Sequence, residues 1–361
     1  MSTDSRRAAR KDDHVRLAEQ QHEQPGPRTD FEDVEFIHHA LGGVSADEVD
    51  LTVRVGNWTW PTPFYVNGMT GGTEKTTTIN RELAITARET GMPMACGSVS
   101  VALDDPSTAR GFTVIREENP DGFVMANLGA GRSGQDAVRA VELLHADALQ
   151  LHVNAVQETA MPEGSRDFSD WARSVATVVE ASPVPVIVKE VGFGLSRRTL
   201  STLSSLGVQI ADVSGKGGTD FLSIESSRRT DTAVIDYSVL TGFGQSALAC
   251  LLDAPADAPQ LLASGGVRNP YDVVKALACG ASAVGVAGVF LKRVLDGGAE
   301  ALVPLVRGWV EQTTAVLALL GASSPAQLRH TDLVVRGGLG EFCQVRGIDR
   351  TALSRRRQDL P

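Results

Sequence analysis

The sequence predicts a (β/α)8 barrel, an α/β fold in which eight parallel strands alternate with helices. Eight short apolar segments that lead into Gly, Ser, Asn or Lys are the expected strands, at residues 64–69, 92–98, 123–128, 148–154, 184–191, 209–214, 260–264 and 283–287. The stretches between them carry apolar residues at helical spacing, for example Val138, Val141 and Leu144. Strands that alternate with helices pair in parallel, and eight such units over ~225 residues approach the ~250 residues typical of this barrel.

The intervening segments predict helices at residues 77–90, 136–145, 169–181, 196–206, 246–252, 271–278 and 302–320. A doubly wound open sheet is the alternative fold, but it usually has fewer strands and a glycine-rich turn after the first one. The connection over residues 215–245 is long, which is typical of a lid or a binding loop.

We divide the chain into three parts: an N-terminal arm and pre-barrel layer (residues 1–62), the barrel (residues 63–322) and a short helical C-terminal appendage (residues 323–361). Residues 1–30 are polar and turn-rich, so disorder or an arm is expected, with a helix-like stretch up to Gln21. Residues 31–41 and the alternating residues 49–55 predict a layer of strands before the barrel. The appendage is charged and is interrupted by Gly337 and Gly338.

The composition limits the class of protein. The chain has 361 residues, 42% of them hydrophobic, and a formal net charge of −10. The absence of an evident basic face argues against a nucleic-acid binder. The four cysteines lie far apart without zinc spacing, so we expect reduced thiols in a cytoplasmic protein. The start of the chain is polar, and no apolar run reaches the ~18 residues of a membrane-spanning helix.

Polar side chains gather at the end of the fourth predicted strand. Alternation along residues 148–154 places Gln150, His152 and Asn154 on one face, and Gln157 and Glu158 follow where a loop should begin. A strand buried on both faces should be nearly all apolar, so these polar groups need partners. They predict a site for a polar, anionic ligand with room for a metal; a hydrogen-bonded polar core with a surface glutamate is the alternative.

Glycines follow the last two predicted strands, in the segments Ser264-Gly-Gly-Val-Arg268 and Gly285-Val-Ala-Gly288. This is the phosphate-binding position of the barrel, because glycines let backbone N–H groups approach an anion. A third glycine-rich segment, Gly215-Lys-Gly-Gly-Thr219, follows the sixth strand. Plain turns are the alternative for each segment taken singly.

Three further charged groups are candidates for the site. Lys189 ends an apolar strand, where a buried lysine needs an anion such as a phosphate or the N1–C2 edge of a reduced flavin; pairing with Glu190 or another core acid is the alternative. Glu158 could hold Mg²⁺ together with phosphate oxygens and waters, or it could be a solvated acid. Arg10 and Lys11 could fold over the site on the arm and exclude water, or they could belong to a solvated tail.

Taken together, these segments resemble the type 2 isopentenyl-diphosphate isomerases, in particular the actinobacterial ones. The resemblance runs from about residue 10 to about residue 295 and rests on Arg10-Lys-Asp-Asp-His14, Met69-Thr-Gly-Gly72, Ala126-Asn127, His152-Val-Asn-Ala-Val-Gln-Glu158, Met161-Pro-Glu-Gly164, Val186-Ile-Val-Lys-Glu-Val-Gly192, Asp212-Val-Ser-Gly-Lys-Gly-Gly-Thr-Asp-Phe221 and Ala263-Ser-Gly-Gly-Val-Arg268.

The resemblance implies an FMN-dependent barrel that interconverts isopentenyl and dimethylallyl diphosphate in isoprenoid biosynthesis. It implies reduced FMN, Mg²⁺, NADPH as reductant, and a homotetramer or homooctamer whose arm covers either its own site or a neighbour's.

The resemblance also implies roles for individual residues. The flavin ring and ribityl chain would be held by Met69, Thr70, Gly71, Ser98, Asn127, Lys189, Ser214 and Thr219, and the FMN phosphate by Gly265, Gly266, Val267, Ala287 and Gly288. The substrate would be faced by Arg10, Lys11, His14, His152, Asn154, Gln157 and Ser196. Glu158 would hold Mg²⁺, and Gln157, His152 and Lys189 would be catalytic.

The chain departs from the family pattern at two places. Val99 and Ser100 follow Gly97-Ser98 where many members carry an arginine, and Phe243 stands where many have a tryptophan. The expected reaction is a 1,3 proton shift, and we hypothesise that the proton comes from the reduced flavin because no side chain named here is an adequate acid. The alternatives are an FMN-dependent oxidase or dehydrogenase of hydroxy acids, and a flavin-binding relative without catalysis.

Overall fold

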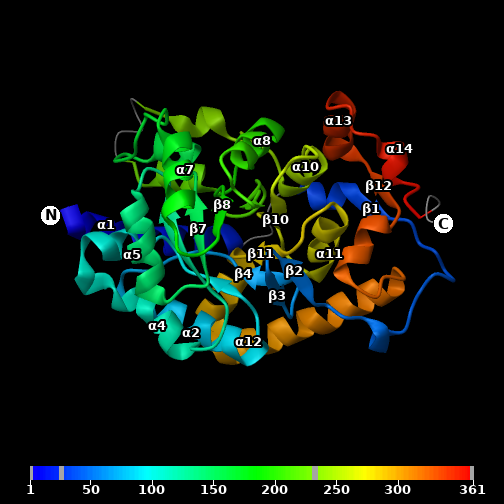
Figure 1. Cartoon of the computed structure of the whole chain (residues 1–361), viewed down its shortest axis with the longest axis horizontal. Coiled ribbons are helices and arrows are strands. Elements are labelled where there is room, and N and C mark those ends of the chain that lie inside the picture. The colour runs from blue at the N-terminus through cyan, green and yellow to red at the C-terminus, as the bar shows by residue number, and fades with distance from the viewer. Residues whose placement is uncertain (1–2, 24–27, 230–234, 358–361) are drawn as a thin grey trace.

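The computed structural model describes residues 3–23, 28–229 and 235–357, and it leaves out the side chains of residues 3–9 and 23. Its centre is a closed barrel of parallel strands, which confirms the predicted fold class (Figure 1). Around the barrel the order is β10-β11-β4-β5-β6-β7-β8-β9. The bounds are β4 (Phe64–Val66), β5 (Met94–Ala95), β6 (Val124–Gly129), β7 (Ala148–His152), β8 (Val186–Lys189), β9 (Ile210–Asp212), β10 (Gln260–Ser264) and β11 (Val284–Val286).

All eight predicted strands are present, each inside its expected segment except β6, which extends to Gly129. Side chains that point outward pack beneath α2 (Glu74–Thr90), α5 (Gly134–Leu144), α7 (Trp171–Ala181), α8 (Arg197–Ser205), α10 (Ala247–Leu252), α11 (Pro270–Ala278) and α12 (Gly288–Leu319). These helices match the predicted segments. The last one is longer than expected, because it begins directly after β11 and includes non-helical Gly297 and Gly298. Two shorter helices, α3 (Ser100–Asp104) and α4 (Arg110–Glu118), connect β5 to β6.

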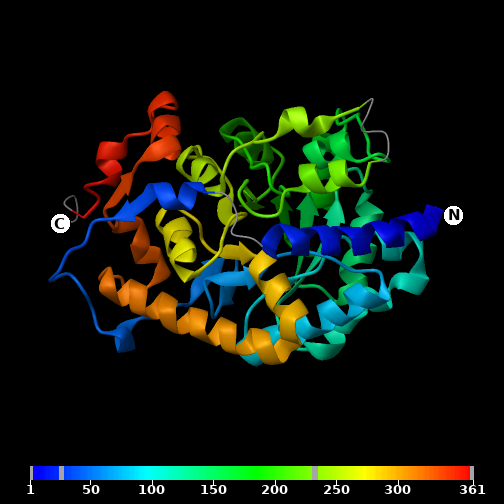
Figure 2. The ribbon, with the colours of Figure 1, turned by 180° about the vertical axis from the view of Figure 1, so that it is seen from behind.

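The N-terminal segment forms a helix, α1 (Thr3–Glu23), which confirms the helix-like stretch expected up to Gln21 and corrects the expectation of disorder. Figure 2 shows α1 in dark blue, lying across the barrel at the end opposite the hairpin β2–β3 described below. Val15 and Ala18 are buried in the main core, and α1 contacts α2, α9 (Phe221–Ser227) and α12. These tertiary contacts stabilise a helix whose polar sequence gives only a weak local signal.

Two other expected loops contain helices. The connection over residues 215–245 holds α9 and the short 3-10 helix η4 (Tyr237–Leu240), while residues 230–234 lie outside the described part. Gln157 and Glu158 lie on α6 (Ala155–Ala160) and not in a loop. Both helices contribute side chains to the cavity described below.

The pre-barrel layer consists of two separate pieces. The hairpin of β2 (Val53–Val55) and β3 (Trp58–Trp60) closes the amino-terminal end of the barrel, where Trp60 packs against Tyr65. β1 (Val34–Phe36) pairs antiparallel with β12 (Leu333–Val335) of the appendage. The appendage also contains η5 (Pro325–His330), α13 (Gly337–Val345) and α14 (Arg350–Leu353). Gly337 and Gly338 therefore begin a helix, where the sequence predicted an interruption.

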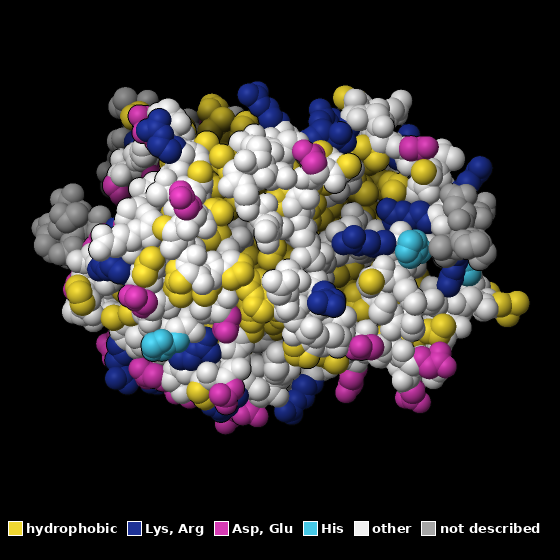
Figure 3. All heavy atoms as spheres, in the orientation of Figure 1, with side chains coloured by type: hydrophobic (Ala, Val, Ile, Leu, Met, Phe, Trp, Pro, Cys, Tyr) yellow, Lys and Arg dark blue, Asp and Glu magenta, His cyan; other side chains and the backbone are white. Residues whose placement is uncertain are grey.

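The face that carries the hairpin shows cationic and anionic side chains interspersed around an area of hydrophobic and uncharged ones (Figure 3). Among the described residues, the helices are all too short or too polar to cross a membrane. The four cysteines are buried thiols without disulfide partners. The end of the barrel opposite this face holds the candidate site.

Candidate active site

A cavity of about 2100 Å³ lies at the carboxyl ends of the barrel strands, where active sites of this fold are found. Its walls come from the strand ends, from α1 and from the loops that contain α6 and α9. Of the predicted site residues, the following line it: Arg10, Lys11, His14, Met69, Thr70, Ser98, Asn127, His152, Asn154, Gln157, Glu158, Lys189, Ser214, Thr219, Gly265, Gly266, Val267, Ala287 and Gly288.

Two predicted residues lie elsewhere. Ser196 is the N-cap of α8: its hydroxyl accepts a hydrogen bond from the Thr199 amide, so capping engages the group expected to face a substrate. Gly71 packs against the ring of Phe112, and a Cβ at this glycine would lie 2.2 Å from that ring.

The floor of the cavity is a hydrogen-bonded polar layer inside the barrel. Its first part is Asp212, whose fully buried carboxylate accepts hydrogen bonds from the Tyr65 hydroxyl at 2.8 Å and from Ser264 at 2.8 Å. The Ser214 amide and the Asn67 side chain also donate to it, at 3.0 and 3.3 Å. A buried carboxylate requires such donors, so this cluster fixes the ends of β4, β9 and β10 relative to one another.

The layer continues across the barrel to β6 and β7. Gln150 donates to Asn67 at 3.4 Å, and Asn127 donates to Gln150 at 3.1 Å. His152 Nδ1 lies 2.9 Å from the Asn127 side-chain oxygen. A hydrogen-bonded polar core, the alternative interpretation of the polar residues of β7, therefore applies to Gln150, which is hydrogen-bonded below the cavity. His152, by contrast, reaches the cavity itself.

His152 is neutral at neutral pH. Burial lowers its pKa to about 3, and the charges of Lys189, Lys11 and Arg10 act in the same direction. Because the Asn127 oxygen can only accept, Nδ1 carries the hydrogen and Nε2 is left as an acceptor. The imidazole is thus a hydrogen-bonding group here and not a cation.

Lys189 ends β8 inside the barrel with 5% exposure. Its ammonium group donates to the carbonyl oxygen of Glu190 at 2.6 Å, whereas the Glu190 carboxylate accepts from the amides of Val191, Gly192 and Phe193. Burial lowers the pKa of Lys189, although Asp212 and Glu190 oppose this shift, and burial raises the pKa of Glu190 to about 7. The alternative of a direct Lys189–Glu190 side-chain pair is therefore not what the structure contains.

The glycine-rich loops after β9, β10 and β11 form one continuous wall. Gly265 has a φ of +94°, and a Cβ there would lie 1.8 Å from the Gly215 carbonyl oxygen, so only glycine fits. Beside this wall, α12 begins at Gly288, and its N-cap residue Ala287 provides no side-chain cap. The Thr70 hydroxyl, on the segment that follows β4, also lines the cavity and is buried without a hydrogen-bond partner. The exposed backbone of the glycine loops suits an anion such as a phosphate, and the unpaired Thr70 hydroxyl suits a polar ligand atom. A flavin mononucleotide offers both groups.

The helix α1 brings cations to the cavity. Burial lowers the pKa of Lys11 to about 8, with Arg10 as the second cause, so Lys11 is charged at neutral pH but titrates just above it. Arg10 pairs with Glu163 at 3.4 Å and lies 3.2 Å from the Met161 sulfur. The predicted arm cations therefore reach the same cavity as Lys189.

Glu225 on α9 is a central group that the sequence reasoning missed. Its carboxylate is fully buried, pairs with His14 at 2.9 Å and Arg228, and accepts a hydrogen bond from Gln157 at 2.9 Å. Burial opposes its ionisation, but the hydrogen bonds and charges of these partners outweigh burial and lower its pKa to about 2. A glutamate three residues after Leu222 on the buried face of α9 was the signal that could have indicated it.

Glu158 lies at the cavity margin on α6. One carboxylate oxygen accepts from Asn154 at 3.3 Å, and the other accepts from the Ser165 amide at 2.8 Å. Each oxygen retains a further lone pair, and the residue lines the cavity. Within the described ranges, no group of three or more His, Cys, Asp or Glu side chains could hold a metal ion. A Mg²⁺ bound by one carboxylate and by ligand phosphates fits this arrangement.

Comparisons with known proteins agree with this geometry. The family described as FMN-dependent dehydrogenase matches residues 133–335. An isopentenyl-diphosphate delta-isomerase of Kitasatospora griseola is 53% identical over 97% of this chain and 95% of its own length. A Streptomyces sp. (strain CL190) protein of the same name is 50% identical over 98% and 96% of the two chains.

The chain belongs to the isopentenyl-diphosphate delta-isomerases. This confirms the predicted family and favours an isomerase over both a hydroxy-acid dehydrogenase and a flavin-binding protein without catalysis. A solved mandelate oxidase structure superposes with a TM-score of 0.63 at 20% identity, over 90% of each chain, and supports the fold alone.

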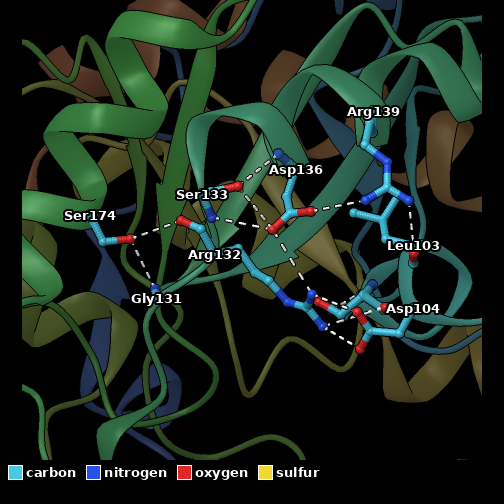
Figure 4. Close-up of polar contacts among 10 residues, drawn as sticks. Leu103, Asp104, Gly131, Arg132, Ser133, Asp136, Arg139 and Ser174 are labelled. Atoms are coloured by element: carbon cyan, nitrogen blue, oxygen red, sulfur yellow. Dashed lines mark hydrogen bonds and ion pairs between the residues drawn. The ribbon is translucent and has the colours of Figure 1, made fainter.

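One departure from the isomerase family pattern has a structural counterpart. Arg132, which follows β6, reaches the loop that carries Val99 and Ser100, and its guanidinium lies 3.5 Å from the Ser100 carbonyl oxygen. It binds both carboxylate oxygens of Asp104 at 2.7 Å (Figure 4). Arg132 therefore places a cation on this side of the isomerase cavity, although Asp104 balances it. Phe243, the second departure, is 55% exposed at the cavity margin.

Replacing Glu225 with Gln tests whether its paired charge makes a pH-dependent contribution to the free energy of unfolding. A carboxyl whose pKa is lower in the folded state stabilises the fold above its unfolded pKa, near 4.5, and loses that contribution as the pH falls toward 2. We expect Glu225→Gln to lower the free energy of unfolding at pH 7 by on the order of 3 kcal/mol. Urea unfolding should show this difference shrinking below pH 4.5, whereas the exposed-site control Glu341→Gln should match the parent protein throughout. A difference that is independent of pH would contradict the role of the charge.

Proposed function

We propose that this isomerase moves the double bond of isopentenyl diphosphate by a 1,3 proton shift, with reduced FMN as the acid and base and Mg²⁺ on the diphosphate. The observation that supports this proposal is that one cavity is lined by two distinct sets of groups. Lys189, Thr70 and the glycine loops suit a flavin, and Arg10, Lys11 and Glu158 suit a diphosphate with its metal.

The flavin is proposed because the alkene of the substrate is unactivated and the nearby side chains are poor acids. His152 is neutral, since its pKa is about 3, and Gln157 is a neutral amide. When bound, reduced FMN supplies the proton donor and acceptor that these side chains lack, and NADPH would keep it reduced. Lys189 would neutralise the anionic edge of the reduced flavin, and Thr70 and Asn127 would hydrogen-bond it.

The diphosphate would be held by the α1 cations and by Mg²⁺ on Glu158. These cations and Mg²⁺ would bind and orient the charged diphosphate while positive charge develops on the carbon skeleton. Gln157 is fixed at both ends of its amide, because it donates to Glu225 and accepts from Asn154 at 3.1 Å. We assign Glu225 the task of holding both Gln157 and His14 toward the substrate.

We also propose that the protein forms a homotetramer or homooctamer.

Turnover in D₂O tests the reaction class. With reduced FMN and Mg²⁺, deuterium should enter both isopentenyl and dimethylallyl diphosphate, and NADPH should be consumed only to reduce the flavin at the start. Gln157→Ala should slow exchange and net isomerisation together, because the same oriented amide serves both. Mass spectrometry of the products and the absorbance of NADPH provide the readouts. NADPH oxidation in proportion to product would instead indicate a dehydrogenase.

Glu158→Gln should abolish most activity and the response to Mg²⁺ while it leaves FMN binding intact. The amide keeps the shape of the side chain but removes the anionic oxygen that Mg²⁺ prefers. Activity is measured across a Mg²⁺ series, and FMN affinity is measured by fluorescence. Glu180→Gln, at an exposed position, is the control and should behave as the parent protein. Parent-like activity of Glu158→Gln at ordinary Mg²⁺ would exclude Glu158 as the ligand.

The pKa of Lys11 predicts the alkaline limb of the pH profile. Lys11 is protonated below its pKa of about 8 and loses its charge above it, so kcat/KM should fall as the pH rises through this value. In Lys11→Arg the fall should move to higher pH, because a guanidinium stays protonated there. The exposed Lys75→Arg control should leave the profile unchanged. An identical alkaline limb in Lys11→Arg would contradict a charged role for Lys11.

A further inference from the structure

His22, near the carboxyl end of α1, lies in the part of the cavity formed by the glycine loops. Its Nε2 atom is 3.1 Å from the Thr219 hydroxyl. A Cβ at Gly288 would lie 2.1 Å from the same nitrogen, so the imidazole rests directly on the backbone at the start of α12. The neighbouring Gln21 holds this turn of α1 in place, since its side chain both donates to and accepts from the Asp220 backbone, at 3.1 and 2.9 Å.

The surroundings of His22 suit an anion. The amino end of α12 has no side-chain cap, the loop with Gly265 and Gly266 lies beside it, and Arg268 lines the same region. Burial lowers the pKa of His22, and the charge of Arg268 lowers it further. The ring is therefore neutral in the absence of an anion and has one N–H to donate.

We propose that His22 is a ligand of the FMN phosphate supplied by α1, and that this contact holds α1 closed over the cavity. The inference rests on the proposed use of FMN. It links two parts of one helix: His22 would meet the cofactor phosphate, while Arg10, Lys11 and His14 would meet the substrate about 12 to 18 Å away along the helix axis. Binding of the cofactor phosphate would thereby bring the substrate-binding cations into position.

A contact between His22 and the cofactor phosphate predicts that His22 variants bind FMN and riboflavin differently. Riboflavin has the same ring system without the phosphate. The parent protein and its His22→Ala, His22→Phe and His22→Gln variants are titrated with each flavin and followed by flavin fluorescence. His22→Ala and His22→Phe should weaken FMN binding roughly tenfold or more, because each removes a hydrogen bond to a charged group. Riboflavin binding should not change, and His22→Gln, which keeps an N–H donor, should recover part of the FMN affinity. Gln20→Ala, on the exposed side of α1, is the matched control.

Hydrogen exchange of the α1 amides gives a second readout that does not depend on activity. FMN should slow exchange across residues 3–23 of the parent protein, and riboflavin should not. In His22→Ala, FMN should lose this effect.

The outcomes separate this inference from the proposed function. Parent-like FMN binding by His22→Ala, tighter FMN binding, or equal weakening toward FMN and riboflavin would each overturn the role of His22 while leaving an FMN enzyme intact. Failure of the parent protein to bind FMN would overturn both proposals.

Discussion

The buried carboxylate of Asp212 is the constraint on which the mouth of the barrel depends. Because a fully buried carboxylate is costly without donors, Tyr65, Asn67 and Ser264 must keep their positions, and with them the ends of β4, β9 and β10. The hydrogen bonds that continue through Gln150 and Asn127 extend this constraint to β6 and β7. Side chains on these strand ends, among them His152, are therefore held by a rigid layer, as a site that must orient a ligand requires.

The helix α1 is attached to this rigid base in a different way. Val15 and Ala18 are its buried apolar residues among the side chains described, and Leu17 packs beside the core while partly exposed. Many of its other attachments are polar. They include the Thr73 hydroxyl, which donates to Asp12 at 2.6 Å, and the contacts of Gln21 and His22 with the loop after β9. Polar contacts to ligand-binding loops exchange readily for contacts to a ligand, so a helix held in this way is suited to open and close as cofactor and substrate bind.

Much of the fold could be predicted from local sequence. Parallel barrel strands are buried on both faces, so β8 and β10 appear as short apolar runs, and their helices carry apolar residues at a period near 3.6. α6 was not predicted as a helix because it is short, and α1 was predicted only as a helix-like stretch up to Gln21 because it is polar; both are stabilised by distant segments. The start of α13 at Gly337 was also missed, since two adjacent glycines normally indicate an interruption.

The sequence by itself determined which chemistry gathers at the strand ends: the glycine loops, Lys189, and the polar groups of β7 all lie at positions where a barrel strand must end. The tertiary structure alone decided how those groups are paired. Gln157 meets Glu225, which is 68 residues away, and His22 meets Thr219, which is 197 residues away. The physical reason is that periodicity and turn chemistry act over a few residues, whereas the charge, orientation and pKa of a buried polar group depend on whichever distant side chains the fold brings within hydrogen-bonding reach.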